Sequence, residues 1–174
     1  QAKMYPQLEN LIRDELAKRP QNPVLLSELG EARFLQNDEA GADSIWRQAL
    51  ELGRNDEMTY RFIADAKLRY GLYDAAIEVY LQGRRTLGRG TLFSLELANI
   101  YEAQRDYVQA VDEYMVQLSE GPERVGFVST KIRGLIEDAD DRDLIIKAIN
   151  TRLKESPGRT ELYEILGDIY IKLG

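Results

Sequence analysis

Hydrophobic and polar positions recur with helical spacing along nearly the whole chain of 174 residues. Apolar residues return every three or four positions, which places them on one face of an α-helix. The first stripe consists of Leu8, Leu11, Ile12 and Leu16. No stretch alternates apolar and polar residues between turn residues, as a half-buried strand would. The pattern therefore predicts an all-α protein.

Short polar or glycine-bearing breaks separate the apolar stripes and mark the ends of the predicted helices. Pro20 ends the first helix. Asn22 is the expected N-cap of the next one, with Pro23 in its first turn and its end near Gln36. Because short connections favour antiparallel neighbours, we expect the helices to pack in antiparallel pairs.

The stripes repeat with a period of 34 residues, so that residues 23–56, 57–90 and 91–124 align as three rows without a gap. One column holds a small residue, another holds an alanine twelve positions later, and a third holds an aromatic residue four positions beyond that. The columns are Gly30, Ala64 and Ala98; Ala42, Ala76 and Ala110; and Trp46, Tyr80 and Tyr114. A small residue facing an alanine lets two helix backbones approach, and the aromatic ring fills the space one turn away.

These columns resemble the tetratricopeptide repeat (TPR), a helix-turn-helix unit of the same length. The resemblance implies a right-handed superhelical solenoid of antiparallel helix pairs, with about ten helices in this chain. We expect residues 1–174 to form a single TPR-like array around the three regular repeats. Residues 5–20 match the second helix of a preceding unit, residues 125–159 a degenerate repeat, and residues 160–174 the first helix of a further, truncated repeat.

Two positions depart from the family pattern. Three places after the small residue the family usually has a large residue, whereas this chain has Arg33 and Lys67, and only the third repeat keeps an aromatic residue, Tyr101. These departures affect the expected local packing more than the fold.

The resemblance also implies a binding surface, because in the family the first helices line a groove that holds an extended peptide or a partner helix. The residues carried over by repeat position are Phe34, Met58, Arg61, Asp65, Leu92, Leu95, Asn99 and Glu102. Four of them are apolar where the packing pattern does not demand it, and clustered exposed apolar side chains indicate an interaction surface. The alternative is that these residues form ordinary solvated helix faces, with Asn99 as a solvated or capping amide.

The carboxylate clamp of the co-chaperone subfamily is not reproduced. Ser27 and Glu31 stand where its first Lys and Asn would be. The chain is therefore not expected to bind the C-terminal tail of a heat-shock chaperone.

Two further segments invite a functional interpretation. The stretch Gly83–Thr91 is similar to a phosphate-binding loop, but that loop needs Lys and Ser or Thr after its second glycine and a preceding strand. Its glycines are better explained as a helix C-cap and hinge. The acidic cluster between Glu137 and Asp143 lacks the spacing of a calcium-binding loop, and Asp140 or Asp141 is expected to cap the following helix.

The amino-acid composition limits which kinds of functional site the chain can form. The chain has no Cys and no His, which excludes disulfides, Cys/His zinc sites, a thiol nucleophile and an imidazole base. No carboxylate pair is placed against a nucleophile or a phosphate-binding loop, so we expect no enzyme activity, no cofactor and no metal site. The formal net charge of −7 argues against nucleic acid as a partner, and no apolar run approaches the roughly 18 residues that span a bilayer. A cytoplasmic location and a periplasmic or secreted one are both compatible with this composition.

The sequence thus predicts a non-enzymatic scaffold that binds a peptide segment or a helix of a partner protein in its concave groove. A second hypothesis is homo-oligomerisation through the terminal helices. Terminal repeats normally carry a polar cap, whereas the last helix is crowded with apolar residues between Leu162 and Leu173.

Overall fold

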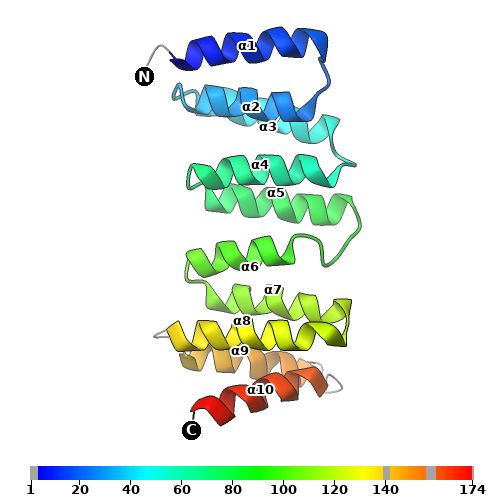
Figure 1. Ribbon diagram of the computed structural model, residues 1–174, viewed down its shortest axis with the longest axis vertical. Coiled ribbons are helices and arrows are strands. Elements are labelled where there is room, and N and C mark those ends of the chain that lie inside the picture. Colours follow the sequence, from blue (N-terminus) through cyan, green and yellow to red (C-terminus); the bar gives the residue numbers. More distant parts are fainter. Residues whose placement is uncertain (1–3, 139–141, 156–159, 174) are drawn as a thin grey trace. The chain divides into compact units, whose positions relative to one another are not determined.

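The computed structural model describes residues 4–138, 142–155 and 160–173, and in these residues all regular structure is helical (Figure 1). The prediction of an all-α protein is confirmed, with ten α-helices among the described residues that follow one another in antiparallel pairs. No helix in this part of the chain is both long and apolar enough to cross a membrane. The chain divides into two compact units, Gln1–Arg89 and Gly90–Gly174.

The first unit contains five helices in which α2 pairs with α3 and α4 pairs with α5 (Figure 1). Helix α1 packs on α2, and α2 also contacts α4. The helices are α1 (Met4–Lys18), α2 (Pro23–Phe34), α3 (Glu39–Leu52), α4 (Glu57–Arg69) and α5 (Tyr73–Thr86).

The second unit begins with the pair α6 and α7 and continues through two short 3-10 turns into three further helices. Helix α9 contacts α7, and α10 contacts α8. The elements are α6 (Ser94–Ala103), α7 (Tyr107–Gln117), η1 (Leu118–Glu120), η2 (Pro122–Arg124), α8 (Val125–Asp138), α9 (Arg142–Glu155) and α10 (Thr160–Leu173).

The backbone of the turn inside each regular repeat has the same conformation. Asn37, Gly71 and Arg105 are 34 residues apart, and all three have positive φ angles, of 61°, 73° and 59°. Only glycine adopts this region without steric cost, so Asn37 and Arg105 are held there by the turn between the two helices. The period read from the side chains is therefore also present in the backbone.

Polar side chains begin several of these helices. Asn22 accepts hydrogen bonds from the backbone N–H groups of Val24 and Leu25 at 3.0 and 3.2 Å, which confirms the predicted cap of α2. Asp38, Asp56 and Asp106 accept equivalent bonds at the starts of α3, α4 and α7. Each cap satisfies backbone donors that the first helical turn leaves without partners.

The aromatic column forms the centre of the packing. Trp46, Tyr80 and Tyr114 are at most 1% exposed, and the polar tip of each ring reaches its own first helix. The Trp46 Nε1–H donates to the carbonyl oxygen of Ser27 at 3.1 Å. The hydroxyl of Tyr80 donates to Asp65 at 2.8 Å, and that of Tyr114 donates to Glu102. Large rings are buried here without leaving their polar atoms unsatisfied.

The third repeat differs from the expected pattern at its start. Its first helix begins at Ser94 rather than near residue 91, because residues 90–93 form a turn with Phe93 at a φ of 61°. The Ser94 hydroxyl donates to the carbonyl oxygen of Thr91 at 2.9 Å and closes this turn. As a result Leu92 and Phe93 are turned inward and retain 7% and 3% exposure. Gly88, with a φ of 63°, follows the last turn of α5, as expected for a glycine C-cap.

The acidic cluster is only partly described. Asp140 and Asp141, the predicted caps of the following helix, lie outside the described residues. Asp143 is exposed in the first turn of α9.

Candidate partner-binding surface

The first helix of the second repeat, α4, carries an apolar pair on its exposed side. Met58 is 44% exposed and Phe62 is 39% exposed. Residues four apart are neighbours on a helix surface, so these two side chains share one stripe. Val24, which occupies the repeat position of Met58 on α2, is 36% exposed. The opposite side of α4 is fully buried through Tyr60, Ile63 and Ala64.

Met58 was predicted as a groove residue, whereas Phe62 and Val24 were not. The signal for Phe62 was present in the sequence, because it is an apolar residue four positions after Met58 and outside the buried stripe of α4. Phe62 is absent from the predicted groove residues because those were assigned by family position alone.

Charged residues flank this apolar pair. Arg61 donates to Glu57 at 3.3 Å, and Arg89 donates to the other oxygen of the same carboxylate. The hydrogen bond from Arg89 is the main factor that lowers the pKa of Glu57, and Arg61 adds to it. Glu57 therefore stays ionised and holds Arg61 beside Met58.

Two other predicted groove residues of the first unit are engaged within the fold. Asp65 accepts a hydrogen bond from the hydroxyl of Tyr80, and the ring centroid of Phe34 lies 4.9 Å from that of Tyr70 and 6.1 Å from that of Trp46. Both side chains are half-buried, so they offer a partner only part of their surface.

The predicted residues of the second unit are more varied. Asn99 is exposed on α6, whereas Leu95 packs partly against the core of the unit and Glu102 accepts a hydrogen bond from Tyr114. Leu92 is 7% exposed, because the turn before α6 folds it inward, and it therefore offers little apolar surface. Asn99 alone among these four presents an open side chain.

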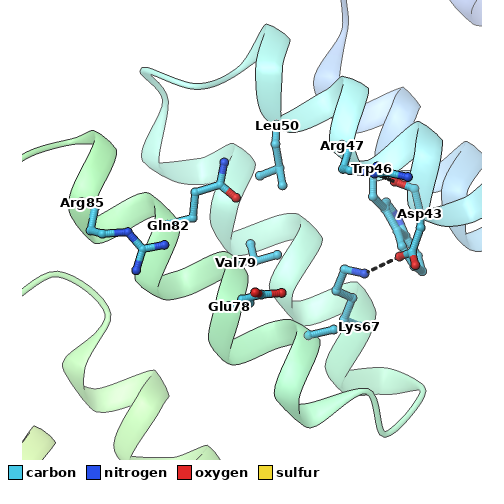
Figure 2. Close-up of a pocket in the computed structure, with 10 residues that line it drawn as sticks. Asp43, Trp46, Arg47, Leu50, Lys67, Glu78, Val79, Gln82 and Arg85 are labelled. Atoms are coloured by element: carbon cyan, nitrogen blue, oxygen red, sulfur yellow. Dashed lines mark hydrogen bonds and ion pairs between the residues drawn. The ribbon is translucent and has the colours of Figure 1, made fainter.

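Lys67 and Arg33, the two residues that depart from the repeat pattern, are buried and half-buried cations. Each has a partner within the fold. Lys67 is 6% exposed, donates to Asp43 at 2.9 Å and places its Nζ 4.2 Å from the centroid of the Trp46 ring (Figure 2). The ammonium thus fills the place of a large side chain while keeping a carboxylate and an aromatic face as neighbours.

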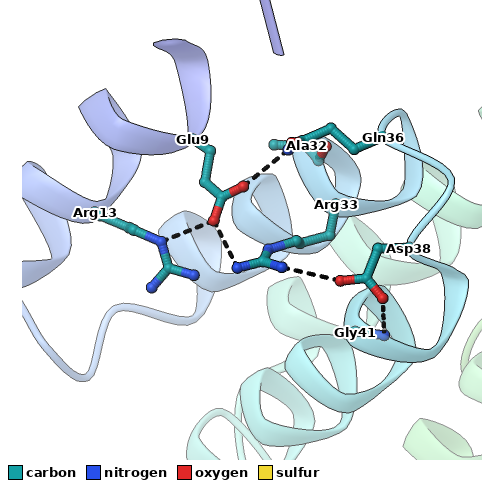
Figure 3. A network of polar contacts seen from close by, with 7 residues as sticks. All are labelled: Glu9, Arg13, Ala32, Arg33, Gln36, Asp38 and Gly41. Atoms are coloured by element: carbon teal, nitrogen blue, oxygen red, sulfur yellow. Dashed lines mark hydrogen bonds and ion pairs between the residues drawn. The ribbon is translucent and has the colours of Figure 1, made fainter. Parts of the chain in front are cut away.

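Arg33 makes the equivalent departure in the first regular repeat. Its guanidinium bridges Glu9 of α1 at 2.8 Å and Asp38 at 3.0 Å (Figure 3). The backbone N–H of Gly41 and then Arg33 lower the pKa of Asp38, which keeps the cap of α3 charged. This network links the residue that departs from the pattern to the start of α3 and to α1.

No group of three or more acidic side chains is gathered as metal ligands would be within the described ranges. The arrangement of α4 instead combines an exposed apolar pair with fixed charges. Such a surface is typical of a contact site for another polypeptide.

Comparisons with known proteins agree on the fold. No protein-family model matches the sequence, and the search of curated proteins finds no match. Among solved structures, the chain is similar to a crystal structure of MamA, a TPR-like protein, with a TM-score of 0.53 and 16% identity over 88% of this chain and 89% of that chain. A second structure of the MamA protein gives a TM-score of 0.52 and 16% identity over 92% and 94%. The chain therefore has a TPR-like, all-α helical repeat fold.

Proposed function

We propose that this protein is a non-enzymatic scaffold that binds a segment of a partner protein along the first helices of its repeats. The observation that carries the proposal is the exposed pair Met58 and Phe62 on α4, beside the Glu57–Arg61 ion pair. A TPR-like fold supports protein binding as the general role. Apolar anchors surrounded by polar groups are the usual composition of such contact sites.

In this proposal the residues have separate tasks. Met58 and Phe62 supply apolar area, and Arg61 orients the backbone or polar side chains of a segment bound at α4. In the second unit, Asn99 offers a polar contact on α6. An exposed amide such as Asn99 can both donate to and accept from a peptide backbone. Phe34, Asp65, Leu95 and Glu102 support the first helices through contacts within their own units.

We expect the double variant Met58→Glu/Phe62→Glu to weaken partner binding by at least about tenfold, because each change puts a charge where apolar surface is buried on binding. The measurement is fluorescence anisotropy with peptides selected from a displayed random library against the wild-type chain. Leu52→Glu is the matched control, because Leu52 is 42% exposed on the second helix α3 of the same unit. Equal affinity of the selected peptides for the double variant and the wild type would remove α4 as the binding surface.

A second candidate function is self-association through the terminal helices. Helix α1 exposes Met4, Leu8 and Leu11 at 64%, 42% and 63%, spaced as one helical stripe. Helix α10 exposes Tyr170 and Ile171 at 53% and 82%. Large exposed apolar faces of this kind are commonly covered by another polypeptide.

If the chain self-associates in this way, Leu11→Glu and Ile171→Glu are each expected to shift the molecular mass measured by light scattering toward that of the monomer. The series should extend over about two decades of concentration, because association is concentration-dependent. A strictly monomeric wild-type chain throughout that series would exclude this second function.

A further inference from the structure

The described part of the first unit contains a cavity on the side of the second helices, away from the predicted groove residues. It lies between α3 and α5, has a volume of about 350 Å³, and reaches Lys67 of α4 (Figure 2). None of the eight residues predicted for the groove lines it. Its volume is at the lower end of the range of ligand-binding pockets and suits one or two side chains.

Lys67 places a nearly buried ammonium group in the wall of this cavity. Its ammonium is almost removed from water but has one carboxylate partner, Asp43, whose own side chain is 58% exposed. An ammonium has three N–H donors, and the described residues provide one hydrogen-bond acceptor together with the face of Trp46. A buried donor gains from a further acceptor, so the site favours a ligand that brings an oxygen.

Charge at the cavity is cationic overall, in contrast to the acidic chain. Arg47, Lys67 and Arg85 line it together with the carboxylates of Asp43 and Glu78. Arg85 is exposed and, among the described residues, has no hydrogen-bond or ion-pair partner. Figure 2 shows Arg85 and Lys67 at opposite ends of the cavity. A carboxylate entering between them would meet positive charge on both sides.

The wall between the two cations is partly apolar, and Glu78 and Gln82 of α5 lie beside its apolar residues (Figure 2). Leu50 of α3 and Val79 of α5 line it, and both are buried. An acidic side chain flanked by aliphatic residues would match both the charged ends and this apolar wall.

We propose that the cavity between α3 and α5 receives an acidic side chain of a partner protein, with Lys67 and Arg85 as its cationic partners. This second contact surface is on the opposite helices of the repeats from the Met58–Phe62 pair and does not depend on it.

The test uses the whole chain, labelled with ¹⁵N, and an acetylated, amidated pentapeptide Gly-Leu-Glu-Leu-Gly. Addition of this peptide is expected to shift amide signals of α3 and α5. The same peptide with Gln or Lys in place of Glu should produce much smaller shifts. The Arg85→Glu variant should weaken binding by about fivefold or more, whereas Arg54→Glu, a charge reversal at an exposed residue outside the cavity, should not.

Several results would overturn the proposal. Equal shifts with the Gln peptide, or shifts confined to α4 around Met58, would exclude the acidic-side-chain site while leaving the proposed function intact. Equally large shifts with acetate or inorganic phosphate alone would show a simple anion site. Arg47→Glu is a second variant of an exposed residue that lines the cavity. Lys67 is buried, so Lys67→Gln is compared only if its amide spectrum shows that it folds. The conclusion therefore rests on Arg85→Glu and Arg47→Glu.

Discussion

Replacing Gly30 with alanine is expected to lower the free energy of unfolding by on the order of 1–3 kcal/mol, although alanine is the better helix former. A Cβ atom at this position would lie 2.6 Å from Cδ1 and 2.9 Å from Cε2 of Trp46. The indole is 1% exposed and is hydrogen-bonded to the Ser27 carbonyl, so it has little freedom to move away. Urea denaturation followed by circular dichroism measures the loss.

The same substitution at Gly134 in α8 is the matched control. A Cβ atom there would meet no atom within 4 Å. Gly134→Ala is therefore expected to leave stability unchanged or raise it by up to about 1 kcal/mol, because only the helix propensity changes. If Gly30→Ala and Gly134→Ala change the free energy of unfolding by similar amounts, the contact with Trp46 is not the reason that position 30 requires glycine.

The other repeats predict a way to relieve the clash. Where Gly30 faces Trp46, the next two repeats place Ala64 and Ala98 in the column of Gly30 and a tyrosine in the column of Trp46. Gly30→Ala should accordingly cost less in a Trp46→Tyr background, with a coupling free energy of about 0.5–3 kcal/mol. A double-mutant cycle with additive effects would contradict this explanation of the two columns.

The regular part of the fold could be predicted because it depends on local, periodic constraints. A 34-residue spacing of small and aromatic residues specifies which helix faces meet, and the structure buries Ala42, Ala76 and Ala110 completely. The Asn22 cap could be predicted for the same reason, since a cap involves only the next few residues.

The features that could not be predicted depend on contacts distant in sequence. Arg33 departs from the pattern, and only the fold places Glu9 beside it. Lys67 likewise finds Asp43 and Trp46 more than twenty residues away. The inward turn of Leu92 follows from the conformation of residues 90–93, which the repeat alignment treated as helix.

The binding surface was predicted by family position, and this approach has a physical limit. A repeat position specifies a helix face, but the exposure of a side chain also depends on its neighbours. Phe34 is covered by Tyr70, whereas Phe62 remains 39% exposed without having been singled out. The helix face on which a residue lies is thus easier to predict from sequence than the exposure of its side chain.

Replacing Tyr114 with alanine is expected to cost about 3–5 kcal/mol, the largest loss among these variants, because it removes a fully buried ring from the second unit. The ring meets Phe127 edge-on, with centroids 6.5 Å apart, and its hydroxyl donates to Glu102. Tyr114→Phe keeps the ring and loses only the hydrogen bond, so about 1 kcal/mol is expected. Equal losses for the two variants would mean that the hydroxyl, not the ring, stabilises this pair of helices.

The pH dependence of stability separates the same two contributions. Burial, and next the hydrogen bond to Glu102, raise the pKa of Tyr114 above its ordinary value of 10.0. The folded chain therefore keeps this proton at alkaline pH while the unfolded chain releases it, so stability falls as the pH rises above that value. Tyr114→Phe should reduce the slope of stability against pH in this range, measured by urea denaturation at several alkaline pH values.

Because burial also raises the pKa of Tyr70, some slope remains in the variant, and the difference in slope between the two proteins is the quantity that reports on Tyr114. An identical slope in both would show that the Tyr114 hydroxyl ionises as readily in the folded chain as in the unfolded one.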